Sequence, residues 1–501
     1  MSKKLHPVML AGTGSDVGKS IIATGLCRIF LQDGYRPAPF KAQNMALNSY
    51  ATPDGLEIGR AQAVQAEAAG LPPETDMNPL LLKPNSEHTT QVVLHGKPIG
   101  NRSAYEYFRR EGRDELRKEV NAAFDRLAQR FNPVVMEGAG SISEINLRDT
   151  DLVNMPMARH ANADVILVAD IDRGGVFASV YGSVMLQTPE DRERIKGIII
   201  NKFRGDMRLF DEGRKLMEEI CGIPVLGVVP MFSDIIIEEE DSVELERKCT
   251  SAMAGKINIA VVLLRHISNF TDFGTLERDE RVNLFYTNNT DELSKADIII
   301  LPGTKSTLSD LYELRKNGVA QAVIRTHKAG KIILGICGGY QMLGQMVCDP
   351  HGVEGNIEQM PGLGLLPLIT TMNSEKVTRQ VRFAFRKDNA WTSPECIGYE
   401  IHQGETRLIN DCTTDHTQPL CRFDDGNTDG FIHHGTCMGT YIHGILDNQP
   451  FIDFLLSLVD KTAENTQTKM TAEEFKNLQY DKLADHLRKH INMNKLYEIL
   501  C

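Results

Sequence analysis

The sequence predicts an α/β protein of two doubly wound domains, each built on a parallel sheet. Short apolar segments that resemble buried strands alternate with helical segments along most of the chain, a pattern typical of parallel sheets. A glycine-rich loop follows the first strand, and a second glycine-rich turn, with a cysteine at its centre, follows a strand near residue 335. In parallel sheets, residues at the carboxyl ends of the strands face the ligand crevice.

Length, charge and cysteine content limit the class of protein. The chain has 501 residues, enough for about two to four domains. It carries 55 Lys and Arg against 67 Asp and Glu, a net charge of −12, whereas a nonspecific nucleic-acid binder is usually basic. Ten cysteines occur without a C-x-x-C pair, which favours a cytoplasmic protein with reduced thiols. Because of the acidic charge, nucleic acid is not an expected partner. We see neither a signal peptide nor an apolar run long enough to span a bilayer, so a membrane is not expected either.

The first strand runs into residues 12–20, Gly-Thr-Gly-Ser-Asp-Val-Gly-Lys-Ser. In such a loop the backbone N–H groups bind phosphates, Lys19 reaches the outer phosphates and the Ser20 hydroxyl faces Mg²⁺. A helix is expected from about Lys19 to Gln32. The alternative is a simple turn, but a Gly-Lys-Ser sequence that opens a helix after a strand argues against it. The predicted ATP-binding residues of this loop are Gly12, Thr13, Gly18, Lys19 and Ser20.

Two later strands end in an acidic or amide side chain. Glu137 ends the apolar strand that starts at Pro133, and a carboxylate at that edge of the sheet beside Ser20 is a candidate Mg²⁺ ligand. A turn or helix-capping role is the alternative for Glu137. Asn201 ends a further apolar strand, 197–201.

Composition places the domain boundaries. A polar, acidic and glycine-punctuated stretch at 236–256 is expected to be a linker between a first domain, 1–235, and a second, 257–455. Residues 456–501 are expected to form a helical tail without a catalytic signature.

Cys337 lies at the centre of the second glycine-rich turn. The apolar run 332–334 is followed by Gly-Ile-Cys-Gly-Gly at 335–339 and then by a helix start. Strand, sharp turn and helix with a nucleophile at the apex is the geometry of the nucleophile elbow, here with sulfur. A helix N-terminus favours the thiolate, which is the reactive form. The alternative is a small buried hydrophobic cysteine, and the flanking glycines favour the nucleophile.

A histidine far along the chain can serve this cysteine. His443 follows a short β-rich run and precedes a glycine. A histidine at a strand end can meet an elbow in space although it is distant in sequence. A lone histidine is more often structural, but the pairing with Cys337 favours a catalytic base.

These two motifs, 335–341 and 439–444, resemble the class I glutamine amidotransferase domain, which has a flavodoxin-like fold. The resemblance implies that Cys337 attacks the side-chain amide of glutamine while His443 shuttles protons. It also implies an oxyanion hole formed by backbone N–H groups of Gly303 and Gly338, and donors of this kind supply a large part of the rate. The chain departs from the family at Ile445, where His-x-Glu is usual. The third catalytic member is therefore not identified from sequence, and Glu400 is one candidate.

More narrowly, the chain resembles the cobyric acid synthase family of the cobalamin pathway over roughly residues 5–450. The first domain resembles dethiobiotin synthetase and MinD-like P-loop proteins. By this analogy Lys41, in Lys-Ala-Gln-Asn-Met, faces phosphates and the substrate carboxylate, although a solvated lysine is the alternative, and Asn201 lies at the adenine. The specific segments are 41–45, 59–62, 77–84 and 266–273.

The resemblance implies glutamine- and ATP-dependent amidation of the b, d, e and g carboxylates of adenosylcobyrinic acid a,c-diamide, which gives adenosylcobyric acid. Glutamine, the corrinoid and ATP are then substrates, Mg²⁺ is the metal, and no tightly bound organic cofactor is expected. The rivals are a cobyrinic acid a,c-diamide synthase and a MinD-like ATPase switch with an inactive glutaminase domain. A homo-oligomer, the order of amidations and the ammonia route stay open.

Overall fold

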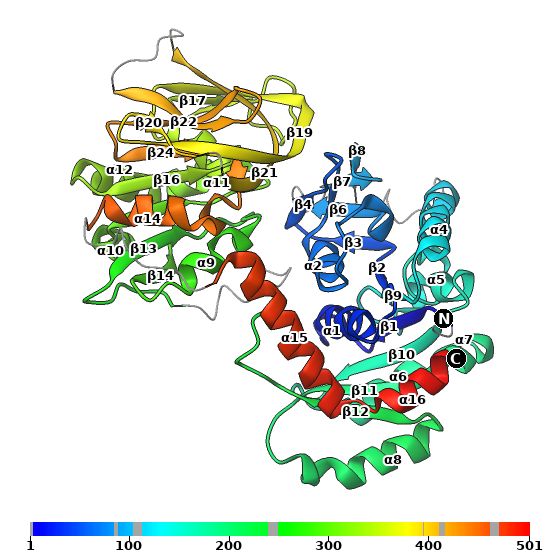
Figure 1. Cartoon of the computed structure of the whole chain (residues 1–501). Coiled ribbons are helices and arrows are strands. Elements are labelled where there is room, and N and C mark those ends of the chain that lie inside the picture. The colour runs from blue at the N-terminus through cyan, green and yellow to red at the C-terminus, as the bar shows by residue number, and fades with distance from the viewer. Residues whose placement is uncertain are drawn as a thin grey trace. The chain divides into compact units, whose positions relative to one another are not determined.

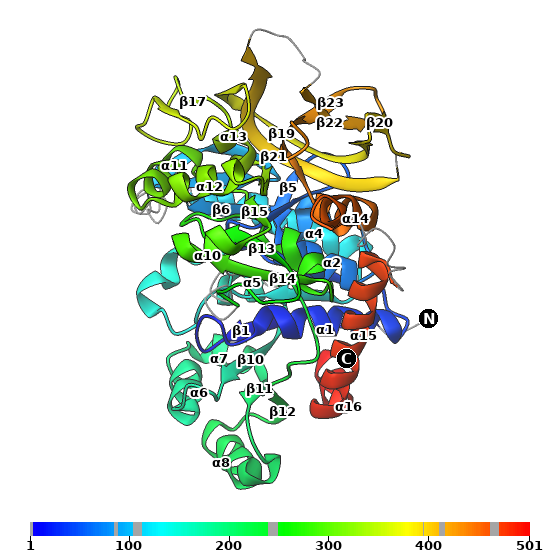
Figure 2. The same cartoon turned by 90° about the vertical axis from the view of Figure 1, so that its left-hand side faces the viewer.

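The chain forms two compact units. The computed structural model describes residues 4–84, 89–103, 113–238, 249–393, 395–409, 416–460 and 470–501. Unit 1 consists of Met1–Ala46, Glu57–Glu238 and Glu473–Cys501, and unit 2 consists of Leu47–Leu56 and Glu239–Ala472. In each unit helices cover a central sheet (Figures 1 and 2). Among the helices that the structure describes, none is long and apolar enough to cross a membrane.

Unit 1 is built on a six-stranded sheet of order β12-β11-β10-β1-β9-β2, with every strand parallel to its neighbours. The strands are β1 (Val8–Gly12), β2 (Ala38–Phe40), β9 (Val134–Glu137), β10 (Asp164–Asp170), β11 (Ile195–Phe203) and β12 (Val225–Pro230). The chain builds outward in both directions from β1, which has β9 on one side and β10 on the other. Ligands bind at such a switch point, outside the carboxyl ends of the strands.

The helices of unit 1 are α1 (Lys19–Gln32), α2 (Arg60–Ala68), α4 (Arg113–Arg130), α5 (Met155–His160), α6 (Val176–Met185), α7 (Pro189–Arg194), α8 (Asp211–Cys221), α15 (Ala472–His490) and α16 (Met493–Leu500). A smaller sheet, β3-β6-β7-β8, lies beside them. It comprises β3 (Gln43–Met45), β6 (Leu80–Pro84), β7 (Thr89–Leu94) and β8 (Lys97–Ser103), and the short strand β5 (Glu57–Gly59) precedes α2. The helix predicted at about Lys19 to Gln32 is confirmed by α1.

Alternate residues of β1 enter two different hydrophobic cores. Val8 and Leu10 belong to a core that side chains of α1, α15 and α16 complete. Met9 and Ala11 belong to a second core that includes side chains of α4, α6 and α8. Because successive side chains of a strand point to opposite faces, a strand covered on both faces must be apolar throughout. Polar chemistry is thereby confined to the strand ends.

Unit 2 contains a 13-stranded sheet whose first part is parallel, in the order β14-β13-β15-β16-β24. These strands are β13 (Ile257–Val262), β14 (Val282–Thr287), β15 (Ile298–Leu301), β16 (Ile332–Ile336) and β24 (Cys437–Thr440). The helices are α9 (Gly274–Glu277), α10 (Thr290–Lys295), α11 (Thr307–Lys316), α12 (Val319–Lys328), α13 (Gly338–Leu343) and α14 (Gln449–Ser457). This part matches the predicted doubly wound arrangement.

The second part of that sheet is mostly antiparallel and was not predicted. It comprises β17 (Met346–Cys348), β18 (Gln359–Pro361), β19 (Leu368–Lys387), β20 (Ala390–Trp391), β21 (Cys396–Leu408), β22 (Thr417–Phe423), β23 (Thr428–His433) and β25 (Ile442–His443). The long strands β19 and β21 pair over most of their length. The last strand, β25, pairs with β21 and carries His443.

The bounds of the two units differ from those of the predicted domains. Leu47–Leu56, with strand β4 (Ser49–Ala51), was predicted in the first domain but belongs to unit 2. The predicted linker 236–256 is divided after Glu238, and the predicted tail 456–501 belongs to unit 2 up to Ala472 and to unit 1 from Glu473. The cause is burial, since Leu483, Leu487 and Leu496 are fully buried in the core beside α1. Figure 1 shows the red helices α15 and α16 beside α1 and β12.

Leu487→Ala should destabilise unit 1, because Leu487 is fully buried. It packs so closely on α1 that a Cβ on Gly25 would lie 2.3 Å from its Cδ1. We expect a loss of about 2–5 kcal/mol of unfolding free energy. Urea unfolding followed by circular dichroism measures the loss, while the emission of the single tryptophan, Trp391 in unit 2, should keep its midpoint. Leu478→Ala on the same helix, where the side chain is 40% exposed, is the control. Equal midpoints for both variants would contradict the role of these helices.

Candidate functional site

The predicted phosphate loop joins β1 to α1 and depends on glycine at two positions. Gly18 has a φ of +93°, and a Cβ there would lie 2.1 Å from the side-chain nitrogen of Asn201. A Cβ on Gly12 would lie within 2.8 Å of the Nζ of Lys19 and of two backbone oxygens. Asn201 donates to the carbonyl oxygen of Val17 at 2.8 Å. The end of β11 is therefore in direct contact with the loop.

Lys19 lies inside this loop. Its Nζ donates to the carbonyl oxygens of Gly14 and Gly140, each at 3.0 Å. Burial lowers the pKa of Lys19 to about 8, and the charge of Glu137 partly opposes the shift. Since loops of this type bind phosphates, the lysine places a cation where phosphate oxygens would lie.

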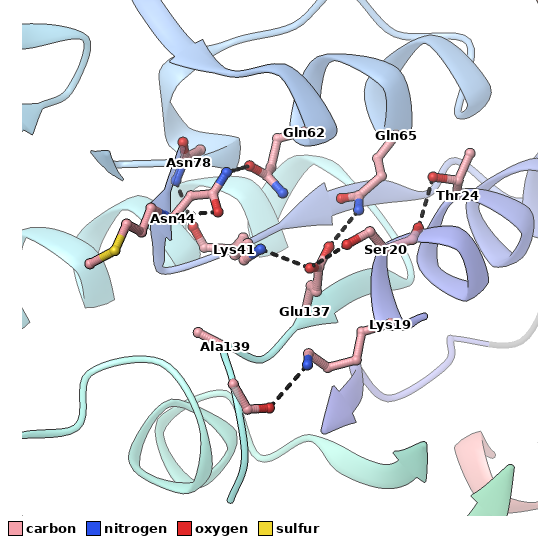
Figure 3. A network of polar contacts seen from close by, with 12 residues as sticks. Lys19, Ser20, Thr24, Lys41, Asn44, Gln62, Gln65, Asn78, Glu137 and Ala139 are labelled. Atoms are coloured by element: carbon pink, nitrogen blue, oxygen red, sulfur yellow. Dashed lines mark hydrogen bonds and ion pairs between the residues drawn. The ribbon is translucent and has the colours of Figure 1, made fainter. Parts of the chain in front are cut away.

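Glu137, at the end of β9, is the centre of a buried polar network (Figure 3). Its Oε1 accepts from Ser20 Oγ and Lys41 Nζ, both at 2.8 Å, and its Oε2 accepts from Gln65 Nε2 at 2.6 Å. Burial alone would raise the pKa of this carboxyl. The charge of Lys41 and the hydrogen bonds from Lys41, Gln65 and Ser20 hold the pKa of Glu137 below its usual value. Glu137 is therefore ionised, and Lys41, which the sequence left open, is buried against it.

Ser20 and Glu137 provide the donor types that Mg²⁺ prefers. The hydroxyl and carboxylate oxygens converge at 2.8 Å, and Mg²⁺ in nucleotide sites is usually held by one or two protein oxygens together with phosphates and water. In the described part of the chain, no group of three or more His, Cys, Asp or Glu side chains could hold a metal ion. The two residues thus fit a metal that reaches the site with a nucleotide.

The segments 41–45, 59–62 and 77–84 meet beside Lys41. Asn44 Nδ2 donates to Gln62 Oε1 at 2.9 Å, and Asn78 Nδ2 donates to the carbonyl oxygen of Lys41 at 3.1 Å. Asn78 Oδ1 also accepts from the backbone N–H of Gly59 at 3.0 Å. These three side chains are nearly or fully buried. Of the three, Asn78 holds the backbone of Lys41 directly (Figure 3).

A cavity of about 480 Å³ adjoins the loop. Six residues that carry a hydroxyl group line it, Thr13, Ser15, Ser141, Ser143, Ser179 and Ser183, together with Gly14, Gly140, Gly182, Glu144, Ala178 and Leu186. Leu186, which directly follows α6, is 45% exposed.

In unit 2, Cys337 lies between β16 and α13 at a φ of 52° and a ψ of −111°. This is the strained backbone expected of a nucleophile elbow. The turn needs small neighbours, since a Cβ on Gly335 would lie 2.7 Å from backbone atoms of Tyr340 and one on Gly339 would lie 2.0 Å from the Leu301 carbonyl oxygen. The thiol is buried, and its Sγ lies 3.6 Å from the carbonyl oxygen of Ile401.

His443 lies at the same place and is buried with an aspartate. Its Nδ1 lies 2.7 Å from Asp272 Oδ2, and Asp272 Oδ1 accepts from the backbone N–H of Gly444 at 3.0 Å. Burial by itself would lower the pKa of His443. The charge and hydrogen bond of Asp272, helped by an interaction with Cys337, instead raise the pKa of His443 to about 10. The imidazole is therefore held as an imidazolium next to the thiol.

Gly303 and Gly338 lie beside these side chains. A Cβ on Gly303 would lie 3.0 Å from His443 Cε1, and one on Gly338 would lie 2.6 Å from the side chain of Thr304. The loop after β15 is thus packed on the start of α13.

Asp272 is the residue that the sequence analysis missed. It lies in the segment 266–273, which resembles the family closely but which offered no mechanism by itself. Glu400, the candidate suggested from sequence, forms an ion pair with Arg379. Ile445, at the position where the family usually carries Glu, is fully buried. Asp272 had one sequence signal, its place in a specific polar-aromatic motif, but nothing local linked it to His443.

Comparison with known proteins agrees with both halves of the chain. A family model described as the CobQ/CobB/MinD/ParA nucleotide binding domain matches residues 8–244. A second, described as the CobB/CobQ-like glutamine amidotransferase domain, matches residues 258–451. The two matches contain the phosphate loop and the cysteine elbow, respectively.

Similar proteins match the chain from end to end. The cobyric acid synthases of Phocaeicola vulgatus and Bacteroides fragilis are each 70% identical to it, over 100% of this chain and 99% of each relative. The cobyric acid synthase of Parabacteroides distasonis is 57% identical over 99% of both chains. With this identity over the full length, and with both domain models matched in order, the chain belongs to the cobyric acid synthase family.

Proposed function

We propose that this enzyme uses glutamine and ATP to amidate the b, d, e and g carboxylates of adenosylcobyrinic acid a,c-diamide, which gives adenosylcobyric acid. The observation that carries the proposal is that one chain holds two complementary sites. One is the buried group of Cys337, His443 and Asp272, and the other is the phosphate loop with the Glu137–Lys41 ion pair. The first can release ammonia, and the second can activate a carboxylate that ammonia attacks.

In unit 2 the proposed reaction is glutamine hydrolysis. The Cys337 thiolate attacks the side-chain amide carbon, and the oxyanion that forms accepts hydrogen bonds from backbone N–H groups near Gly303 and Gly338. The His443 imidazolium gives its proton to the leaving ammonia, which leaves a thioester. The neutral imidazole then takes a proton from the water that hydrolyses the thioester and releases glutamate. Asp272 keeps His443 in the orientation that both steps need.

In unit 1 the proposed reaction is carboxylate activation. A corrinoid carboxylate oxygen attacks the outer phosphorus of ATP and displaces ADP, which gives an acyl phosphate. Ammonia then attacks the acyl carbon, and inorganic phosphate leaves. Lys19 and Lys41 offset the charge of the transferring phosphoryl group, and Mg²⁺ bound by Ser20 and Glu137 would neutralise the phosphate oxygens.

The cavity beside the loop is the proposed site of the corrinoid carboxylate. Its hydroxyl-bearing residues and the glycine backbone suit carboxylates and amides, and the exposed Leu186 suits the apolar face of a macrocycle. We assign Thr13 and Ser141 to the reacting end of this cavity because the two residues bridge the phosphate loop and the turn after β9.

The two alternative functions would use these sites differently. A cobyrinic acid a,c-diamide synthase would amidate other carboxylates by the same chemistry, and the relatives at 70% identity, which carry the name cobyric acid synthase, argue against it. A MinD-like switch would have an inactive glutaminase. The contacts of His443 with Asp272 and Cys337 argue against that role, since an inactive glutaminase would not require a buried charge pair at this place.

Cys337→Ser should lower glutamine-dependent amidation by at least about 1,000-fold, because removing a nucleophile costs about that or more. Amidation with ammonium should stay parental, because it does not use the thiol. The measurement is amide formation by mass spectrometry with glutamine or with ammonium as the nitrogen source. Cys249→Ser, at an exposed cysteine of unit 2, is the control. Glutamine hydrolysis by Cys337→Ser at the parental rate would show that the nucleophile is another residue.

Asp272→Asn should shift the pH dependence of glutamine hydrolysis. Asp272 raises the pKa of His443 to about 10, so the imidazolium is present below that pH and is lost as the pH rises through it. The alkaline limb of kcat/KM should therefore lie near pH 10 in the parent and move to lower pH in the variant, with a fall in kcat. Glu400→Gln should move the limb less, because Glu400 pairs with Arg379. An alkaline limb that stays in place in Asp272→Asn would remove Asp272 from the mechanism.

Lys19→Ala and Glu137→Gln should each lower ammonium-dependent amidation by about 100-fold or more, because charge neutralisation and positioning supply most of phosphoryl-transfer catalysis. Each variant is mixed with Mg-ATP, ammonium and a candidate corrinoid, and ADP and amides are counted together. The parent should form one ADP per amide on the a,c-diamide and stop when four carboxylates have reacted. The exposed α8 variants Lys215→Ala and Glu219→Gln are matched controls. Steady ADP formation by the parent with no amide on any corrinoid would favour the switch.

A further inference from the structure

Unit 2 contains a segment that lies about 200 residues before the rest of it in the sequence. The chain leaves unit 1 after Ala46, contributes residues 47–56 to unit 2 and returns to unit 1 at Glu57. We call residues 47–56 the inserted segment. It contains strand β4, and the side chains of Asn48, Ser49 and Ala51 are almost completely buried.

The first contact of the inserted segment is with the turn that carries Asp272. The backbone N–H of Asn269 donates to Asn48 Oδ1 at 2.5 Å, and the backbone N–H of Ser49 donates to Asn269 Oδ1 at 3.1 Å. Asn269 has a left-handed φ of 54° and immediately precedes the short helix Phe270–Phe273. The N–H of Asp272 donates back to the carbonyl oxygen of Asn269 at 3.1 Å. Asn48 therefore fixes the residue from which the Asp272 turn begins.

The second contact reaches the other side of the histidine. The ring of Tyr50 lies 4.9 Å from the ring of Tyr399, centroid to centroid, and Tyr399 stacks on the His443 imidazole at 5.4 Å and 22°. The carbonyl oxygen of Ala51 accepts a hydrogen bond from Gln380 Nε2 at 3.1 Å, which fixes the strand on β19. Tyr399 also pairs with His443 in the ladder between β21 and β25.

We propose that the inserted segment is a positioning element of the glutaminase, with Asn48 and Tyr50 as its positioning residues. Asn48 acts on the imidazole through Asn269 and Asp272, and Tyr50 acts on it through Tyr399. The glutaminase centre is then built from two distant parts of the chain, and residues 257–455 do not complete it. This inference rests on the proposed glutaminase function.

The physical reason is the sensitivity of the charge pair to distance. Asp272 and His443 form a buried ion pair at 2.7 Å, and the attraction between buried charges falls as they separate. Cys337, Glu400 and His402 also act electrostatically on His443. These three groups lie outside the inserted segment, which carries the titratable side chains of Tyr50 and Asp54. The contacts described above for Asn48 and Tyr50 are with Asn269 and Tyr399, the neighbours through which we expect substitutions to act on His443.

Asn48→Ala removes the oxygen that fixes Asn269, and Tyr50→Ala removes the ring behind Tyr399. We expect each to lower kcat for glutamine hydrolysis by about 10- to 100-fold, as a small displacement of a catalytic group does, with little change in KM. Asn48→Ala should also move the alkaline limb of kcat/KM to lower pH. Tyr50→Phe, which keeps the ring, should recover activity. Pro53→Ala, at an exposed position of the same segment, is the control.

Two further measurements distinguish a failure of the positioning role from a failure of the proposed glutaminase function. Emission of Trp391, which lies in unit 2, shows whether each variant is folded there, and ammonium-dependent amidation should stay parental. If the folded variants keep the parental kcat and the parental alkaline limb, while Cys337→Ser is inactive with glutamine, the positioning role is wrong and the glutaminase assignment stands. If Cys337→Ser retains glutamine hydrolysis, the proposed function itself fails. A loss of stability with an unchanged pH limb would show a structural role only and would overturn the proposal.

Discussion

Parallel strands that are covered on both faces leave only their ends for polar chemistry, and this constraint organises both units. In unit 1 the two faces of β1 are packed into separate cores, so the phosphate loop, Glu137 and Asn201 all lie where strands end. In unit 2 the same holds for the loop after β15 and for Cys337 after β16, whereas His443 lies on the short strand β25 that follows β24. The apolar strands thus restrict the reactive side chains to the strand ends, whatever the types of those side chains.

Each site also contains a buried charge pair, and such pairs are costly to assemble. Taking two charges out of water costs several kcal/mol per ion, and their attraction repays this only with good geometry and further hydrogen bonds. Glu137 meets this condition through Lys41, Ser20 and Gln65, and Asp272 meets it through His443 and the N–H of Gly444. An apolar pair of the same shape would serve stability as well. The proposed reactions, which create or move charge at the same places, would account for these buried charges.

The path of the chain couples the two units by covalent continuity. Residues 47–56, which closely follow strand β3, belong to unit 2. Helices α15 and α16, from the end of the chain, belong to unit 1. Neither unit is a continuous stretch of sequence.

The sequence by itself determined the local features. Three features depend only on residues close together in the sequence, so they can be recognised from a short stretch. They are the loop that needs glycine at 12 and 18, the elbow that needs glycine at 335 and 339, and the strands that are apolar on both faces. The family resemblance added Gly303, Asn201 and Lys41, whose positions beside the loops the structure then described. Tertiary structure alone decided three further features. They are the aspartate that pairs with His443, the antiparallel half of the second sheet, and the assignment of segments 47–56 and 473–501 to the units. Asp272 and His443 are 171 positions apart and Asn48 and Asn269 are 221 apart, and a contact over such a distance depends on how two surfaces pack rather than on any pattern within either segment.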